Sequence, residues 1–459
     1  MPIIGAAVVP HPPIILPDIG RGEEQKIAAT TAAYEKIAAD IAALRPDTIV
    51  VTSPHALMYA DYFHVSPGAS ASGDFARFGF PNLKFSVDYD EDFVATLKKI
   101  AGEKDFPAGT LGDREPALDH GTMIPLYFIE KEIKIPWVRI GLSGLPMKMH
   151  YELGQMLRAA ADKLERRVFL VASGDLSHKL KDDGPYGFAA EGPEFDERTM
   201  AALEKGDFLS LMEIDDVFAK KAAECGLRSF WIMAGAFDGQ AVKTENLAHE
   251  GPFGVGYGVS KIMPVGKDES RHLLAKWEEK QASKMKVRRE REDDLVKLAR
   301  NTLEKYVTTR EVLAPENLPA ELTENRGACF VSLKKHGQLR GCIGTFLPTR
   351  NNLAAEIIGN AIAAGTEDPR FDPVKADELK DIVYSVDVLS TPVPVSSEKE
   401  LDPKKYGIIV ECQNRRGLLL PDLEGVDTVD EQINIARQKG NIAPHERVQL
   451  YRFTVVRHH

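Results

Sequence analysis

Histidines follow several of the apolar runs in the first half of the chain. His11 follows IIGAAVVP, His55 follows DTIVVTSP, and His178 lies in RVFLVASGDLSH. His120 opens HGTMIPLYFI, and Glu250 follows NLAH. Imidazoles and carboxylates bind catalytic metals and move protons near neutral pH. One such histidine alone would more often be structural, but five sites with the same pattern indicate a shared centre.

The elements around these residues alternate in type. From residue 3 to about 265, short β-branched runs (IIGAAVV, DTIVVTS, RVFLVAS) alternate with helical patterns such as EEQKIAATTAAYEKIAADIAAL and YELGQMLRAAADKLE. This alternation predicts an α/β domain with a mainly parallel sheet flanked by helices. Ligands of such sheets bind beyond the carboxyl ends of the strands, so residues that follow the strands would meet there.

Composition limits the class of protein. The chain has 459 residues, too many for one core, so we expect two domains. A net charge of -11 argues against a nucleic-acid partner, because phosphate contacts need a surplus of Lys and Arg. No run approaches the ~18 apolar residues of a membrane span, and the N-terminus lacks the features of a signal peptide. We therefore expect a cytoplasmic protein without membrane contact.

The chain organises into two stretches joined by a charged segment. We predict a metal-binding domain over 1–266, a charged connecting helix over 267–287 and a mixed α/β domain over 288–459. The four cysteines are Cys225, Cys329, Cys342 and Cys412. They lack CxxC spacing, which indicates reduced thiols and neither a zinc knuckle nor a disulfide framework.

A metal is the simplest reason to gather these side chains. Two imidazoles and one carboxylate on one side of an ion, with the other positions open, suit Fe(II) in oxygen-activating enzymes. The same ligands with a water also serve catalytic zinc. The ligand types do not choose the metal, so Fe(II) is the first candidate and Zn or Mn the alternatives.

Five segments of the first stretch resemble a known family. They are, in order, VVPHPP, TSPHAL, LDHGTMIPL, ASGDLSHKL and HEGPFGVGY. Together they are similar to the class III extradiol ring-cleaving dioxygenases (LigB-like), a superfamily that also contains the Memo proteins. The resemblance covers residues 1–265. It implies Fe(II) held by His11, His55 and Glu250, with His120 facing a small phenolic or catechol-like substrate or O2.

The resemblance gives His178 the role of an acid/base. A catechol must lose protons to chelate the metal, and a histidine with a pKa near ~6.5 can accept one and later return it. We expect Gly174 to let the chain bend sharply before His178. Asp175 stands where the ring-cleaving enzymes often carry glycine and Memo-like members carry aspartate. It would orient His178, raise its pKa or act as an extra ligand.

The second stretch resembles another family. HGQLRGCIGTFLP followed by EDPRFDPV is similar to the AMMECR family, over residues 288–459. The fusion resembles the AmmeMemoRadiSam system, which implies a radical SAM protein as partner. The chain has no cluster-binding CxxxCxxC, so radical chemistry would reside in that partner.

Cys342 is the candidate reactive group of the second stretch. A thiol beside Arg340 could have a lowered pKa and act as a nucleophile, although burial as a small apolar residue is the favoured explanation. Arg340, Arg370 and Asp368 could form an anion-binding pocket for a substrate or a structural ion pair. The sequence leaves both alternatives open.

The sequence thus predicts an iron-dependent oxidoreductase of the extradiol type fused to an AMMECR domain. One alternative is a Memo-like metalloenzyme with non-oxidative chemistry that works with a radical SAM partner. Another is a metal-binding scaffold. Apolar helix faces are compatible with a homodimer, and we expect Phe230 and Trp231 in RSFWIMAGAF to be helical core.

Overall fold

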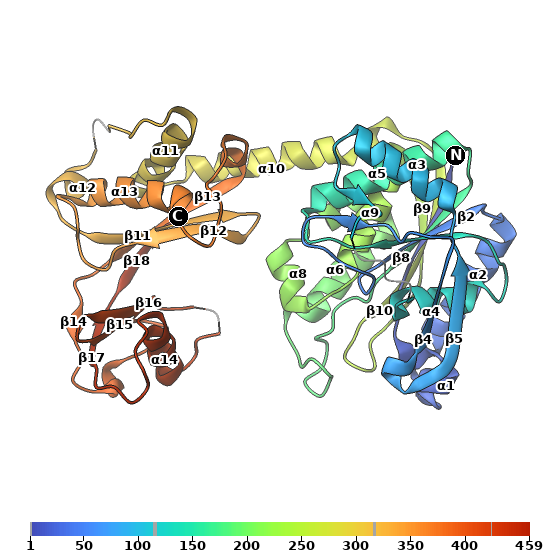
Figure 1. Ribbon diagram of the computed structural model, residues 1–459, viewed down its shortest axis with the longest axis horizontal. Coiled ribbons are helices and arrows are strands. Elements are labelled where there is room, and N and C mark those ends of the chain that lie inside the picture. The colour runs from blue at the N-terminus through green and yellow to red at the C-terminus, as the bar shows by residue number, and fades with distance from the viewer. Residues whose placement is uncertain (1, 113–116, 315–317, 424) are drawn as a thin grey trace. The chain divides into compact units, whose positions relative to one another are not determined.

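The computed structural model describes residues 2–112, 117–314, 318–423 and 425–459 (Figure 1). Two compact units, Met1–Lys280 and Gln281–His459, divide the chain. The division lies within the helix α10 (Leu273–Glu290), whose charged side chains are mostly exposed. This helix overlaps the segment predicted to connect two domains.

A six-stranded sheet forms the centre of the first unit. Its strands are, in spatial order, β7 (Trp137–Gly141), β2 (Thr48–Ser53), β8 (Val168–Ser173), β1 (Ile3–Val9), β10 (Tyr257–Lys267) and β9 (Gln240–Glu250). The first four are parallel to one another, whereas β10 and β9 pair antiparallel. The prediction of a mainly parallel sheet is therefore confirmed.

Helices cover both faces of this sheet (Figure 1). On β1, Ala6 and Val8 pack in the core that contains α3 (Glu91–Glu103), α5 (Met147–Leu164) and α9 (Leu227–Ala236). Ala7 and Val9 pack on the other face, in the core that contains α2 (Ala28–Leu44) and α4 (His120–Ile129). Because successive side chains of a strand point to opposite faces, a strand covered on both faces must be apolar throughout.

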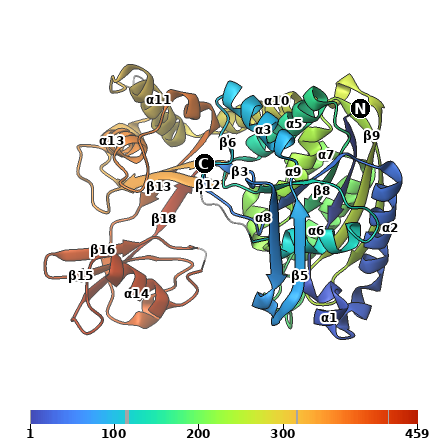
Figure 2. The same cartoon turned by 45° about the vertical axis from the view of Figure 1, so that its right-hand side comes forward.

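Further elements extend the first unit. They are α1 (Pro17–Gly20), β3 (Phe63–His64), β4 (Ser70–Phe75), β5 (Phe80–Asp88), β6 (Ala108–Gly109), α6 (Glu191–Lys205), α7 (Phe208–Met212) and α8 (Asp216–Ala222). Strands β4 and β5 pair as an antiparallel hairpin, with the short helix Ala76–Phe78 between them. Figure 2 shows this hairpin as a pair of long strands beside the central sheet.

The register of the parallel strands places the site. Val9 pairs with Ser173, and Thr52 pairs with Ala172. Strands β1, β2 and β8 therefore end at the same edge of the sheet. The segments that follow them begin side by side, and side chains distant in sequence can meet there.

The second unit contains two four-stranded antiparallel sheets. The first consists of β12 (Gln338–Gly344), β11 (Ala328–Lys335), β13 (Ile382–Leu389) and β18 (Val455–His458), and the second of β14 (Val393–Pro394), β17 (Gln449–Phe453), β15 (Gly407–Cys412) and β16 (Arg415–Leu419). The helices are α11 (Asp294–Thr309), α12 (Ala320–Glu324), α13 (Leu353–Thr366) and α14 (Val429–Lys439). The predicted mixed α/β class is confirmed.

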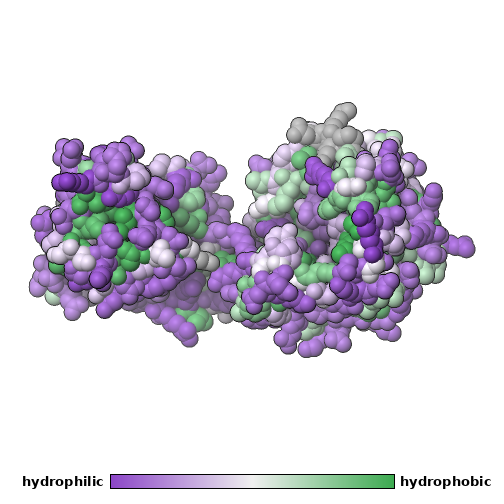
Figure 3. Space-filling view, turned by 90° about the horizontal axis from the view of Figure 1, so that it is seen from below, coloured by the Kyte–Doolittle hydropathy of each residue, from purple (hydrophilic) through white to green (hydrophobic). Residues whose placement is uncertain are grey.

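The surface view in Figure 3 shows hydrophilic side chains over most of one face of each unit, with scattered apolar patches. Among the residues that the structure describes, no helix has both the length and the apolar character that a membrane span needs.

Candidate metal centre

His11 follows β1 and is buried. Its Nδ1 lies 2.9 Å from the Oγ of Ser173, and that hydroxyl donates to the carbonyl of Gly121 at 2.6 Å. Because Ser173 uses its proton on Gly121, His11 Nδ1 must be the donor between them and Nε2 carries the lone pair. The hydrogen-bond network therefore selects the tautomer of His11 that can bind a metal through Nε2.

Two further imidazoles lie against His11. His55 follows β2, and its Nε2 lies 3.0 Å from the Nε2 of His11. The ring of His120 stacks on His55 with 4.0 Å between centroids and lies 5.3 Å from the ring of His11. His120 is the first residue of α4, and Asp119 caps that helix. The structure thus brings together three of the histidines that the sequence singled out.

Cys225 joins this group from the segment before α9. Its Sγ lies 3.6 Å from the Nε2 of His11. The ligand atoms of His11, His55 and Cys225 all lie within 4.8 Å of one another. One ion can span such a group with bonds of about 2.0 to 2.3 Å. Two imidazoles and a thiolate are a ligand set for a transition metal.

Asp175 and His178 lie beside the same thiol. The ligand atoms of Asp175, His178 and Cys225 form a second group within 4.8 Å. The carboxylate of Asp175 accepts the backbone N–H of His11 at 2.8 Å, and its Oδ2 lies 3.9 Å from the Nε2 of His178. The ring of His178 meets Tyr186 edge-on at 5.2 Å. Its Nδ1 is buried and has no hydrogen-bond partner among the described residues.

Gly174 has a different role from the predicted sharp bend. Its backbone lies outside the left-handed region. A Cβ at this position would collide with the Cα of Gly226. The contact between the two glycines holds the end of β8 against the segment before α9, where the N–H of Asp175 lies 3.2 Å from the Sγ of Cys225. Close backbone approach, and not a bend, is therefore what requires glycine here.

Burial disfavours charge on five side chains of this centre. It lowers the pKa of His11 and of His55, and it lowers the pKa of His120 to about 3. Burial also raises the pKa of Asp175 and of the Cys225 thiol. Burial thus keeps the imidazoles in the neutral form that binds a metal, whereas a bound cation would have to oppose the effect of burial on Asp175 and Cys225 by favouring their charged forms.

The structure does not bring Glu250, the predicted carboxylate ligand, to His11 and His55. Glu250 ends β9, and its carboxylate accepts hydrogen bonds from the backbone N–H and the hydroxyl of Thr30, at 2.8 and 2.7 Å. Thr30 lies in the first turn of α2, where free N–H groups attract a carboxylate. Among the described residues, no group of converging ligand atoms contains Glu250. Cys225 is the third member of the group that contains His11 and His55.

Cys342 lies on β12 of the second unit and is half-buried. The hydroxyl of Ser332 lies 3.2 Å from its Sγ. Its backbone N–H donates to Asp368 at 2.9 Å, and its carbonyl accepts from Arg370 at 3.3 Å. Burial raises the pKa of the thiol, which favours the neutral form over the nucleophilic thiolate.

The charged residues near Cys342 are paired with one another. Arg340 does not contact the thiol but binds the carboxylate of Glu378 through Nε at 3.0 Å and Nη2 at 2.9 Å. Arg370 binds Asp368 in the same two-pronged way, at 2.9 and 2.7 Å. Of the two alternatives that the sequence left open, this geometry matches structural ion pairs.

Cys225 is the functional candidate that the sequence did not single out. Its only signal is a Cys-Gly step before the apolar segment LRSFWIMAGA, which is too common to predict a ligand. The expectation for that segment is confirmed, since Phe230 and Trp231 are 0% and 2% exposed in the core.

The geometry and the comparisons with known proteins agree. The first unit is an α/β domain with a largely parallel sheet. Its candidate metal centre, made of imidazoles and a thiol, lies at the carboxyl edge of that sheet. The family described as the catalytic LigB subunit of aromatic ring-opening dioxygenase matches residues 5–260, and the AMMECR1 family matches residues 296–458. The chain therefore belongs to the LigB family and carries an AMMECR1 domain, as both resemblances implied.

Relatives are known over the whole chain and over part of it. A protein of Clostridium acetobutylicum is 42% identical over 470 residues, which cover 100% of this chain and 99% of its own. A protein of Thermotoga maritima is 56% identical over 170 residues, 36% of this chain and 98% of its own. An uncharacterised protein of Pyrococcus horikoshii is 32% identical, with a TM-score of 0.34, over 36% of this chain and 88% of its own. One from Escherichia coli K12 is 19% identical, with a TM-score of 0.38, over 57% and 99%.

Proposed function

We propose that the first unit is a metal-dependent oxidoreductase of the ring-opening dioxygenase type that acts on a small phenolic or catechol-like substrate. The observation that carries this proposal is the convergence of the ligand atoms of His11, His55 and Cys225 within 4.8 Å. Membership of the LigB family supports the reaction class. The proposed metal is Fe(II), held by these three residues.

The ligands are prepared for a metal before it binds. Ser173 holds His11 with Nε2 free, and the Nε2 of His55 faces the same point at 3.0 Å. Together with the His55 imidazole and the Cys225 thiol, His11 would hold the metal through three ligand atoms. Fe(II) held there would pass electron density from a bound catechol to O2, so that the catechol is oxidised and the iron undergoes no net change.

His178 is the proposed proton carrier. It lies beside the ligand group and not within the His11 group, so a proton on its ring does not compete with the metal. Its side chain is partly exposed, and its imidazole would accept the hydroxyl proton of a substrate. Asp175 Oδ2, 3.9 Å from Nε2, would then stabilise the imidazolium that forms.

Anaerobic reconstitution with Fe(II), Zn(II) or Mn(II) tests this function. We expect Fe(II) protein to consume O2 and to convert catechols into yellow ring-opened products. His178→Phe should keep iron but lose turnover by at least about 100-fold. His249→Phe is the matched control, because His249 binds Asp196 at 3.2 Å and lies outside the ligand groups. Fe(II) protein that consumes no O2 with any catechol would contradict the proposal.

Cys225 supports a second candidate function. A cysteine thiolate is a common zinc ligand, whereas the usual Fe(II) site has a carboxylate in that place. With zinc bound, the same centre could polarise or hydrolyse a substrate without oxidation. A radical SAM partner would belong to this alternative. Zinc-dependent turnover without O2 uptake in the reconstitution experiment would favour it.

A further inference from the structure

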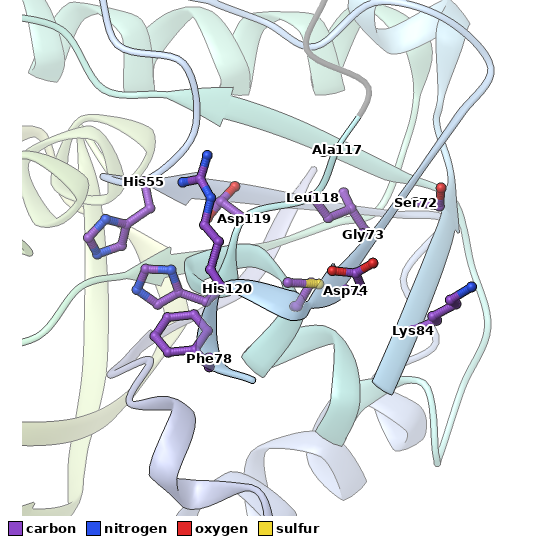
Figure 4. Close-up of a pocket in the computed structure, with 12 residues that line it drawn as sticks. His55, Ser72, Gly73, Asp74, Phe78, Lys84, Ala117, Leu118, Asp119 and His120 are labelled. Carbon is purple, nitrogen blue, oxygen red and sulfur yellow. The ribbon is translucent and has the colours of Figure 1, made fainter. Parts of the chain in front are cut away.

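Asp119 comes directly before α4 and lies with His55 and His120 at one end of a pocket of about 440 Å³ (Figure 4). Its side chain is only 7% exposed. Among the described residues, Asp119 belongs to neither group of converging ligand atoms, so its carboxylate is not a proposed metal ligand. The contacts of this carboxylate show what else it does beside the metal centre.

The carboxylate of Asp119 joins the start of α4 to the turn that carries His55. Its Oδ1 accepts the hydroxyl of Ser53 at 2.5 Å and the backbone N–H of Thr122 at 3.0 Å. The hydroxyl oxygen of Ser53 accepts the backbone N–H of His55 at 3.2 Å. A continuous chain of hydrogen bonds therefore runs from the first turn of α4 to the proposed ligand His55.

A buried arginine stands behind the carboxylate. Arg139 on β7 is 1% exposed, and its Nη1 lies 3.6 Å from the Oδ2 of Asp119. The same guanidinium donates to the hydroxyl of Ser66 and to the carbonyl of Ala117, both at 2.7 Å. Buried polar networks whose members are satisfied hold a rigid geometry. Asp119 is therefore fixed from the side of the sheet as well as from α4.

The first turn of α4 also reaches the support of His11. The carbonyl of Gly121 accepts the hydroxyl of Ser173, which holds the Nδ1 of His11. A Cβ on Gly121 would lie 2.4 Å from the Oγ of Ser53 and 3.5 Å from the Nδ1 of His11. Only glycine permits so close an approach of the backbone. One turn thus contacts the hydroxyl groups that support both proposed histidine ligands.

We propose that Asp119 is a positioning residue for the metal centre, which sets the directions of His11 and His55 by fixing Ser53 and the first turn of α4. This inference rests on the proposed metal site, but not on the reaction that the metal supports. Because Asp119 acts through hydrogen bonds, the acceptor at Oδ1 should determine metal affinity, whereas the negative charge that faces Arg139 should affect mainly the stability of the fold.

Competition with a chromophoric chelator under anaerobic conditions measures the affinity for Fe(II) and Zn(II). Asp119→Ala removes the acceptor and should lower the affinity by about 10- to 100-fold, the range for residues that support metal ligands. Asp119→Asn keeps an acceptor at Oδ1 and should stay within about threefold of the wild type. Ser53→Ala breaks only the link to His55 and should lower the affinity by about tenfold.

Asp90→Ala is the matched control. Asp90 caps α3 by accepting the N–H of Phe93 at 3.0 Å, accepts the hydroxyl of Thr48 and lies 3.7 Å from Arg166. It thus has a helix cap, a hydroxyl donor and an arginine, but lies outside both ligand groups and the pocket. Asp90→Ala should lower stability in urea as Asp119→Ala does, yet leave metal affinity unchanged. The visible absorption of the Co(II) protein, which depends on ligand geometry, should change only in Asp119→Ala.

The outcomes separate this inference from the proposed function. Wild-type affinity in Asp119→Ala, or an equal loss in Asp90→Ala, would overturn the positioning role. An equal loss in Asp119→Asn would make the charge the cause and overturn it as well. If Asp119→Ala does not fold, Ser53→Ala decides, and wild-type affinity there overturns the role. The expected losses in protein that consumes no O2 with Fe(II) would overturn the dioxygenase reaction and leave the positioning role standing, whereas wild-type protein that binds neither metal would overturn both.

Discussion

The metal-centre group of the first unit and the Cys342 region of the second use similar residue types in opposite ways. Around Cys342, each nearby carboxylate is matched by an arginine, as in Asp368 with Arg370 and Glu378 with Arg340. In the first unit, Asp175 is buried beside imidazoles and a thiol, and no arginine or lysine pairs with it among the described residues.

The pKa values reflect this difference. Arg370 lowers the pKa of Asp368, and Arg340 lowers the pKa of Glu378 to about 2, so both acids are fixed in the charged form. Burial acts the other way on Asp175 and raises its pKa. Charges satisfied within the fold contribute stability, whereas polar groups that converge without a counter-ion are suited to bind one.

The largest difference between the regions should be in metal affinity. His11→Ala removes the imidazole that Ser173 holds with Nε2 free, and should lower the affinity for Fe(II) or Zn(II) by more than about 100-fold. Mutation of a residue that only hydrogen-bonds a metal ligand typically lowers metal affinity by about 10- to 100-fold. Cys342→Ala should leave affinity unchanged. Competition with a chromophoric chelator measures both. Equal losses in the two variants would place the metal elsewhere.

Acid should weaken the first unit before the second. His150 is fully buried, and burial lowers its pKa to about 3 in the folded protein. Below about pH 6.5, the ordinary pKa of histidine, the unfolded chain therefore binds a proton on His150 that the folded chain does not bind. The first unit should therefore lose about 2 to 3 kcal/mol between pH 6.5 and 4.5. In the second unit, the pKa of Glu378 is lowered to about 2. The stability that Glu378 contributes is therefore lost only as the pH falls from about 4.3 toward 2.

Tryptophan fluorescence can follow the first unit alone, because Trp137, Trp231 and Trp277 all lie within it. Far-UV circular dichroism follows both units. The fluorescence transition should come at higher pH than the loss of the remaining ellipticity, and His150→Phe should shift it to lower pH. An unshifted transition in that variant would rule out His150 as a source of acid sensitivity.

The smallest effect concerns a satisfied pair. Asp368→Asn removes the charge that holds Arg370 and the backbone of Cys342, and should lower the free energy of unfolding of the second unit by about 2 kcal/mol. Asp427→Asn is the control, since Asp427 pairs with Lys404 at the exposed surface and should cost under about 0.5 kcal/mol. Urea unfolding followed by circular dichroism measures both. A change in metal affinity in Asp368→Asn would contradict the separation of the two regions.

Much of the fold and part of the site could be predicted from the sequence. The alternation of apolar runs with helical patterns indicated the parallel sheet, because strands covered on both faces must be apolar throughout. His11 and His55 were predicted to meet because residues that follow parallel strands of one sheet share one edge, and β1 and β2 both pair in parallel with β8. Local pattern and elementary sheet geometry were sufficient for both.

The third member of the converging ligand group was decided by the tertiary structure alone. Cys225 reaches His11 across 214 residues of sequence, through a contact between Gly174 and Gly226 that no local pattern encodes. Glu250 lies at a strand end as expected, yet its carboxylate binds the first turn of α2. A sequence specifies which residues end a strand, but the direction of a side chain there depends on which distant backbone packs against it.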